Sequence, residues 1–322
     1  MSEFSLIDRF CKNIGVKHNN TIIDVGDDAA VIDVPDNMQL ATSVDTMVEG
    51  VHFFPNANPA DLAHKLLSVN LSDMAAMGAE PKWATLALTL PDADLQWIGS
   101  FSKSLDSVAQ RFGVQLVGGD TTYGPLTLSL NIMGLVPKNK AISRSGAQVG
   151  DAVYLSSCVG DAALALKFLQ GEVELSDSEA ATVLPALHRP EPQVELGLDL
   201  RELANACLDI SDGLVADLAH IAKQSNITIE VDVDVVPVSK VYQQYIARGG
   251  SIDLALCGGD DYQLAFTVPQ QLRQSVATLS SRLQLQLLEI GQVITQTGQL
   301  VALSQRGKPY QLASDSGYQH FG

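Results

Sequence analysis

Positive charge is scarce in this sequence, and the shortage limits its partners. The 322 residues include 20 Lys and Arg against 37 Asp and Glu, which gives a formal net charge of −17. Such an acidic surface repels polyanions, so nucleic acid and anionic membranes are not expected as general partners. If the substrate is itself a phosphate, positive charge has to come from outside the chain, and Mg²⁺ is its usual source.

Cysteine is also rare. The four cysteines, Cys11, Cys158, Cys207 and Cys257, are far apart and form no Cys-x-x-Cys pair. This spacing argues against a structural zinc site and against a disulfide framework. We expect the reduced thiols of a cytoplasmic protein.

Long apolar runs are missing as well. No run approaches the roughly 20 residues of a membrane span, and the first ten residues carry Glu3 and Asp8 and lack the apolar core of a signal peptide. We therefore expect no membrane association. The hydrophobic fraction of 46% is that of a globular protein, and the length favours about two domains.

The common phosphate-binding motifs are absent too. The sequence has no Gly-x-x-x-x-Gly-Lys-Ser/Thr loop and no Gly-x-Gly-x-x-Gly fingerprint. It also lacks the His-Arg-Asp and Asp-Phe-Gly signatures of protein kinases and the Gly-x-Ser-x-Gly elbow of hydrolases. Any phosphate chemistry must therefore use other residues.

Apolar periodicity predicts an α+β fold. In the first half we expect short strands at 21–25 and 29–34, strands at 39–45, 83–90, 114–117 and 126–136, a helix beginning at Pro59 with Asn58 as N-cap, and a helix over 94–112 ended by Gly113. From residue 39 this order is close to a ferredoxin-like split β-α-β layout with one strand attached.

A polar, turn-rich stretch over 137–150 separates the two halves. We place the N-terminal domain at 1–137 and the C-terminal domain at 148–322. Strands at 152–156, 207–210, 227–233, 262–268, 287–293 and 300–304 alternate with helices in the second half, which indicates a mixed α/β domain. Gly-Gly-Asp follows an expected short strand in each half, 114–117 before residues 118–120 and 254–257 before residues 258–260, which hints at a duplicated architecture.

Asp73 is the most unusual aspartate of the chain. It stands in the apolar, small-residue run 70–79, and no Lys or Arg lies between Lys65 and Lys82. A carboxylate in a domain interior is costly unless a cation or hydrogen-bond donors meet it. The alternative is that Asp73 caps a new helical turn beginning at Met74.

Other aspartates follow predicted strands and sit beside Gly, Ser or Thr. Taken singly, each is an ordinary turn residue. Taken together, they suit a magnesium site, because ligands bind outside strand ends and Mg²⁺ prefers hard oxygen donors. The set is Asp27, Asp28, Asp45, Asp120, Asp209, Asp212, Asp260 and Asp261.

Three further features have two interpretations each. Arg144 either clamps a nucleotide phosphate or is a solvated linker arginine. The turn Val159-Gly160-Asp161 either offers N–H groups to a phosphate or is an ordinary glycine turn with a helix cap, and the second is favoured. His52 either contacts a ring-bearing substrate or packs within its loop, and again the second is favoured.

The ordered motifs resemble the thiamine-monophosphate kinases of the aminoimidazole ribonucleotide synthetase-like superfamily over nearly the whole chain. The resemblance is carried by residues 3–7, 26–30, 45–53, 70–79, 118–122, 143–146, 209–214 and 258–262. It implies a PurM-like two-domain fold, an N-terminal domain that pairs with a second subunit to make a homodimer, and transfer of the ATP γ-phosphoryl group to thiamine monophosphate with several Mg²⁺ ions.

The resemblance also assigns roles to residues. Catalysis falls to Asp45, Asp73 and Asp120. The metal positions are Asp28, Ser43, Val44, Asp45, Asp73, Asp120, Asp209 and Asp212. Nucleotide contacts match Gly119, Asp120, Arg144 and Ser211, and substrate contacts match His52, Asp260 and Tyr318.

Two positions depart from the family pattern. Val44 replaces the usual Thr, which is harmless if its backbone carbonyl is the ligand. Asp260 replaces the usual Glu and is one methylene shorter, which questions its reach to the substrate. Two rivals stay open: another superfamily enzyme, such as a selenophosphate or aminoimidazole ribonucleotide synthetase, and a non-catalytic protein that binds divalent cations or nucleotides. Cys11 lacks the glycines expected around a selenophosphate synthetase cysteine.

Overall fold

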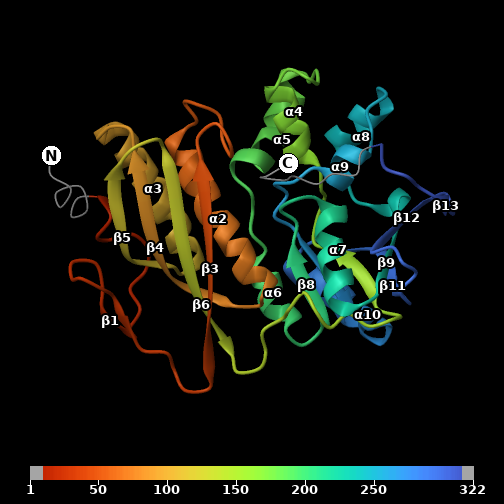
Figure 1. Cartoon of the computed structure of the whole chain (residues 1–322), viewed down its shortest axis with the longest axis horizontal. Coiled ribbons are helices and arrows are strands. Elements are labelled where there is room, and N and C mark those ends of the chain that lie inside the picture. Colours follow the sequence, from red (N-terminus) through yellow and green to blue (C-terminus); the bar gives the residue numbers. More distant parts are fainter. Residues whose placement is uncertain (1–9, 314–322) are drawn as a thin grey trace. The chain divides into compact units, whose positions relative to one another are not determined.

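The computed structural model describes residues 10–313, and the chain divides into two compact units (Figure 1). Unit 1 comprises Met1–Met74 and Ala79–Ala141, and unit 2 comprises Ala75–Gly78 and Ile142–Gly322. Each unit has its own β-sheet and its own helices. The α+β class predicted from the sequence is confirmed.

Unit 1 is built on a four-stranded sheet. Its order is β3 (Met38–Val48), β6 (Thr127–Pro137), β4 (Glu80–Leu90) and β5 (Gln115–Tyr123). β6 is antiparallel to both of its neighbours, whereas β4 and β5 are parallel. Because β6 lies between β3 and β4, the predicted split β-α-β arrangement is present.

Two long helices connect these strands. Asn58 Oδ1 accepts a hydrogen bond of 2.8 Å from Ala60 N at the start of α2 (Pro59–Ala76), as predicted for an N-cap. Asp94 caps α3 (Leu95–Phe112) in the same way, and Gly113 ends it in a left-handed conformation with φ 70°. The sequence signals therefore located both helices.

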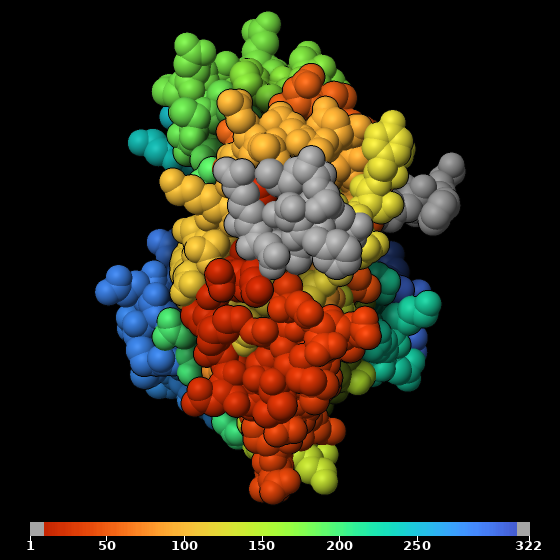
Figure 2. All heavy atoms as spheres, turned by 90° about the vertical axis from the view of Figure 1, so that its left-hand side faces the viewer, coloured from red at the N-terminus to blue at the C-terminus, as the bar shows by residue number. Residues whose placement is uncertain are grey.

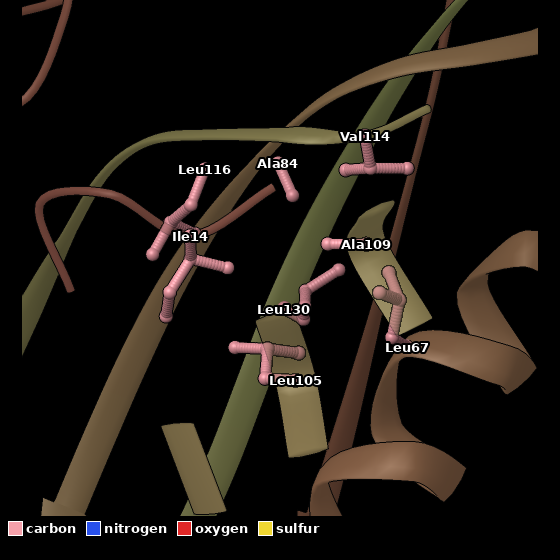
Figure 3. A pocket seen from close by; sticks show the side chains of 8 residues that line it. All are labelled: Ile14, Leu67, Ala84, Leu105, Ala109, Val114, Leu116 and Leu130. Carbon is pink, nitrogen blue, oxygen red and sulfur yellow. The ribbon is translucent and has the colours of Figure 1, made fainter. Parts of the chain in front are cut away.

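The helices cover one face of the sheet. Leu67 of α2 and Leu105 of α3 meet Leu130 of β6 around an apolar void of about 10 Å³, which is too small for a ligand (Figure 3). On the opposite face, Trp83 packs with Val117 and Leu135 and donates a hydrogen bond of 2.8 Å to Thr21 Oγ1.

β5 is longer than the sequence predicted. The expected strand over 114–117 continues to Tyr123, so Gly118, Gly119 and Asp120 lie inside a strand and not in a loop after it. The two glycines weaken the sequence signal for a strand, but pairing with β4 overrides it. The short strands β1 (Thr21–Ile23) and β2 (Val31–Ile32) form a separate antiparallel pair.

Unit 2 is built on a seven-stranded sheet. Its order is β13 (Lys308–Pro309), β12 (Val301–Gln305), β9 (Thr228–Asp232), β11 (Leu288–Ile294), β7 (Ala152–Leu155), β10 (Leu264–Val268) and β8 (Ala206–Asp209). β12 and β9 are parallel, and the other pairs are antiparallel.

Helices surround this sheet in a mixed α/β arrangement, as predicted. They are α4 (Asp161–Leu169), α5 (Asp177–His188), α6 (Val194–Leu200), α7 (Leu214–Ser225), α8 (Lys240–Ala247), α9 (Asp253–Cys257) and α10 (Arg273–Leu283), with 3₁₀ turns at Val233–Val235 and Gln270–Leu272.

One predicted strand is wrong. Residues 254–257 belong to helix α9, in which Ala255 and Leu256 are fully buried. A run of four apolar residues does not distinguish a strand from a buried helical turn. The Gly-Gly-Asp at 258–260 thus follows a helix, whereas the one at 118–120 lies within a strand. The hint of a duplicated architecture is not supported.

The ends of three strands of unit 2 lie at the same end of its sheet. Leu155 at the end of β7 pairs with Ala265, and Asp209 at the end of β8 pairs with Leu264. β7 and β8 therefore end where β10 begins, and the loops that follow or precede them meet there.

Among the described residues, no helix is both long and apolar enough to cross a bilayer.

Candidate active site

In unit 1, strand β3 and helix α2 bring three predicted site residues together. Ser43 and Asp45 are two positions apart on β3, so their side chains share one face of the strand. Ser43 Oγ donates a hydrogen bond of 2.5 Å to Asp73 Oδ2. α2 continues past Asp73 to Ala76, so Asp73 lies inside the helix and does not cap a new turn.

The two carboxylates of this group affect each other. Burial, and then the nearby Asp73 carboxylate, raise the pKa of Asp45 to about 7. A divalent cation would remove this repulsion, and the Ser43 hydroxyl adds a third hard oxygen donor. Nowhere in residues 10–313 do three His, Cys, Asp or Glu side chains come close enough to hold a metal ion by themselves. The oxygen donors present nevertheless fit Mg²⁺, which takes few protein ligands and keeps waters or substrate oxygens.

Asp120 lies far from this group. β3 and β5 are the two outer strands of the sheet, and Asp45 is in register with Leu130, Leu86 and Gly119 across it. Three strand spacings amount to about 14 Å. A single ion, with ligands at roughly 2.1 Å, cannot reach both Asp45 and Asp120 within one copy of unit 1.

The exposure and hydrogen bonds of three other predicted site residues of unit 1 limit how each could act. Asp28 is exposed in the turn between β1 and β2, where its N–H donates to Asp27 Oδ1. The Val44 side chain is 61% exposed on the face of β3 opposite Asp45, so only its backbone carbonyl is available as a ligand. His52 Nδ1 accepts a hydrogen bond of 3.0 Å from Val48 N, so a substrate contact by the ring would have to use Nε2.

In unit 2, the loop after β8 is organised by a residue that the sequence reasoning missed. Asp217 Oδ2 accepts hydrogen bonds from the N–H groups of Ser211, Asp212 and Gly213 at 3.0, 3.0 and 3.1 Å. Burial raises the pKa of Asp217 to about 6 although these bonds oppose the rise. The available signal was an acidic residue in the first turn of the helix after Ser-Asp-Gly.

This arrangement limits what the loop can bind. The Ser211 N–H is engaged by Asp217, and the Ser211 carbonyl accepts from Asp260 N at 2.9 Å. A nucleotide contact by Ser211 would therefore use its hydroxyl. Asp209, only 5% exposed, ends β8 just before this loop.

The segment before β10 is locally strained. Asp260 and Tyr262 have φ angles of 68° and 49°, which are left-handed values that such residues seldom adopt. Tyr262 N donates to Ile210 O at 2.8 Å, and the Tyr262 hydroxyl donates to Asp260 Oδ1 at 3.0 Å. The shorter Asp260 side chain is thus oriented by Tyr262.

Arg144 and the glycine turn after β7 complete the predicted set. Arg144 is exposed in a segment that runs beside β8, where Ser143 O accepts from Cys207 N at 3.1 Å. In the turn, Val159 N donates to Pro237 O and Gly160 N donates to Asp261 Oδ1. Those N–H groups are in use, which favours the ordinary turn. Tyr318 lies outside the described residues.

Comparisons with known proteins agree with this architecture. The N-terminal domain model of AIR synthase related proteins matches residues 26–136, and the C-terminal domain model matches residues 148–302. The thiamine-monophosphate kinase of Escherichia coli (strain K12) is 42% identical over 320 residues, covering 99% of this chain and 98% of that protein.

Solved structures give the same result. The crystal structure of the thiamine-monophosphate kinase from Stenotrophomonas maltophilia has a TM-score of 0.87 at 41% identity, covering 96% of this chain and 98% of that chain. AaThiL complexed with AMPPCP and TMP has a TM-score of 0.78 at 31% identity, with 92% of each chain covered. The chain has the two-domain fold of the AIR synthase related proteins and, within that class, belongs to the thiamine-monophosphate kinases.

Proposed function

We propose that the chain transfers the γ-phosphoryl group of ATP to thiamine monophosphate, giving thiamine diphosphate and ADP. The observation that carries this proposal is the pair of ligands in AaThiL, a relative that is similar over 92% of this chain and was solved with AMPPCP and TMP. The Ser43, Asp45 and Asp73 group supports it, because this group suits the magnesium that accompanies ATP.

The acceptor itself makes a general base unnecessary. A phosphate monoester has a second pKa near ~6, so thiamine monophosphate is largely a dianion at neutral pH. The barrier then consists mainly of charge repulsion and alignment in an in-line transfer. Mg²⁺, when bound, would neutralise phosphate charge and fix phosphate oxygens in place. The oxygen ligands offered by the chain would be those of Asp28, Ser43, Val44, Asp45, Asp73, Asp120, Asp209 and Asp212.

Nucleotide and substrate would be held by different residues. Gly119, Arg144 and the Ser211 hydroxyl are the proposed nucleotide contacts, with Asp120 beside Gly119. His52 through Nε2, Asp260 and Tyr318 are the proposed contacts with thiamine monophosphate. The three strand spacings of about 14 Å in total between β3 and β5 support more than one ion, because Asp45 and Asp120 would each need their own metal.

Unit 1 would also form the contact of a homodimer. β3 is an outer strand of its sheet, and Leu40 and Val44 are 47% and 61% exposed on one of its faces. Ile22 and Val31 of β1 and β2 are 58% and 45% exposed. The red-to-orange segment that contains these strands forms a broad part of the face shown in Figure 2. A second copy would cover these apolar side chains. None of the four cysteines, all within residues 10–313, is in a disulfide, and reduced thiols suit the cytoplasm.

An assay of ADP release tests the proposal and separates it from its rivals. Purified protein is incubated with ATP, Mg²⁺ and one acceptor at a time: thiamine monophosphate, thiamine, selenide, formylglycinamidine ribonucleotide or none. We expect ADP release only with thiamine monophosphate and loss of release with EDTA. Formation of ADP or AMP that depends on another acceptor would favour another enzyme of the superfamily. Binding of nucleotide without acceptor-dependent release would favour a non-catalytic binding protein.

A further inference from the structure

Asp261 is a buried carboxyl group that the sequence includes among the aspartates suited to a magnesium site, and the proposed reaction gives it no role. Asp261 is only 8% exposed to solvent. Oδ1 accepts a hydrogen bond of 2.8 Å from Gly160 N, while Oδ2 is buried and has no hydrogen-bond partner among residues 10–313. A carboxylate placed in this way would leave half of its charge without compensation.

Three other carboxyl groups lie near Asp261. Asp161 of α4, Asp217 of α7 and the neighbouring Asp260 raise the pKa of Asp261, after the larger effect of burial, and the Gly160 N–H opposes them. Cys158 before α4 and Tyr242 of α8 are further titratable groups near it, and burial raises the pKa of both. No basic side chain of residues 10–313 is among the main causes of this shift, and the buried Oδ2 has no hydrogen-bond donor there, so the protonated form of Asp261 is the one that these surroundings favour.

Asp261 also joins two loops. It lies between Asp260 and Tyr262, the two residues with left-handed backbone, and it holds Gly160, whose φ is 94°. Strained backbone persists only where surrounding contacts fix it. The hydrogen bond to Gly160 is such a contact, because it connects the turn before α4 to the 260–262 segment.

The space beside Gly160 is filled by its neighbours. A Cβ atom on Gly160 would lie 2.6 Å from Ala255 Cβ and 2.9 Å from Tyr242 Cε2. The turn is therefore pressed against α8 and α9, and its N–H reaches Asp261 at ordinary hydrogen-bond length.

We propose that Asp261 is a positioning residue that works as a neutral carboxylic acid, fastening the Gly160 turn to the 260–262 segment and thereby setting the direction of the Asp260 side chain. The part that concerns Asp260 rests on the proposed function, in which Asp260 contacts thiamine monophosphate. The bond to Gly160 and the protonation state do not rest on it.

Asp261→Asn and Asp261→Ala separate the two parts of the proposal. Asn keeps a neutral side chain and an acceptor for Gly160 N, whereas Ala removes the acceptor. Asp151→Asn is the matched control in the same unit. Asp151 is 3% exposed, and its two oxygens accept hydrogen bonds from Asn205 Nδ2 and Gln148 N. The NH₂ group of an asparagine at this position would therefore face another hydrogen-bond donor.

Thermal unfolding of the intact chain as a function of pH tests the protonation state. A carboxyl whose folded pKa is raised contributes stability that is lost as pH rises from its unfolded value near ~4 through its folded value. Asn has no such loss. We expect the Tm of Asp261→Asn to match or exceed that of the wild type at pH 7, with a difference that grows from pH 5 to pH 8. A fall in Tm as large as that of Asp151→Asn would overturn the neutral assignment.

Hydrogen exchange and kinetics test the positioning. Exchange of the Gly160 amide should stay slow in Asp261→Asn and become at least ~10-fold faster in Asp261→Ala, because the acceptor is gone. The KM for thiamine monophosphate should rise at least ~10-fold in Asp261→Ala, with the KM for ATP within ~3-fold of the wild-type value. Unchanged exchange and unchanged KM in Asp261→Ala would overturn the positioning role.

Failure of the proposed function gives a different pattern. In that case the wild type itself would form no thiamine diphosphate, and the role toward Asp260 would fall with it. The pH dependence of Tm and the exchange of Gly160 need no substrate, so they still decide the bond to Gly160 and the protonation state. If Asp261→Ala does not fold, the comparison of Asp261→Asn with Asp151→Asn decides the outcome.

Discussion

The Ser43 hydroxyl donates a hydrogen bond of 2.5 Å to Asp73 Oδ2, and this bond connects strand β3 to helix α2. It places an aspartate from the middle of an apolar helix beside Asp45, the aspartate two residues further along β3. Two carboxylates this close are unfavourable without a cation, which is why we propose metal binding, and not stability, as the role of the group.

Asp73→Asn should separate these two roles. The amide keeps an acceptor for Ser43 but removes a charge, so we expect turnover to fall at least ~1,000-fold, equivalent to about 4 kcal/mol. Without metal, the Tm should be unchanged or higher, because repulsion with Asp45 disappears. Steady-state kinetics and thermal unfolding measure both. Retained activity would mean that Asp73 does not ligate a metal.

Asp217→Ala should loosen the loop after β8. It removes one oxygen that accepts three backbone N–H groups, and we expect a loss of about 2–4 kcal/mol in the free energy of unfolding. Asp217→Asn keeps a carbonyl acceptor and should lose less. Urea denaturation gives both values. Equal stability of the two variants would show that the three hydrogen bonds contribute little.

Gly119→Ala should disrupt the pairing of β5 with β4. A Cβ atom there would lie 2.0 Å from Leu86 O, which is backbone and cannot move aside, so we expect a loss of about 3 kcal/mol or more. Gly99→Ala is the control, because Gly99 lies inside α3 and its nearest neighbour would be 3.4 Å away at Phe10 Cε1. That change should stabilise the fold by about 0.5–1 kcal/mol. Similar Tm values for the two variants would contradict this account.

Glu179→Gln should change the acid stability of unit 2. The Ser176 N–H, then Arg248 and the Ser176 hydroxyl, lower the pKa of Glu179 to about 2. Because the folded pKa is depressed, the stabilisation is present above the unfolded value near ~4.3 and is lost as pH falls toward 2. Urea denaturation should show the wild type more stable than the variant at pH 7 and equal to it near pH 2. A difference that persists at pH 2 would rule out the ionised carboxylate as its source.

The sequence was informative where local chemistry decides the structure. The N-cap Asn58 located the start of α2 and the C-cap Gly113 located the end of α3, because capping depends on a few adjacent residues. It failed for β5, where two glycines mask a strand that pairing with β4 stabilises. It also failed for α9, which is too short for its apolar periodicity to be read.

The candidate site was predictable in composition but not in arrangement. The sequence identified Asp45, Asp73 and Asp120 as unusual aspartates, but it contains no information on strand order. The structure places Asp45 on one outer strand and Asp120 on the other. Asp217 and Asp261 were missed as organising residues because their hydrogen bonds to the loops of unit 2 exist only in the folded chain.

The most direct test of the central claim is to follow the γ-phosphorus of ATP. The protein is incubated with γ-³²P-labelled ATP, Mg²⁺ and thiamine monophosphate, and the products are separated by chromatography. The account predicts that the label appears in the terminal phosphate of thiamine diphosphate, in proportion to the ADP formed. Label recovered only as inorganic phosphate, or left in ATP at every Mg²⁺ concentration, would contradict it.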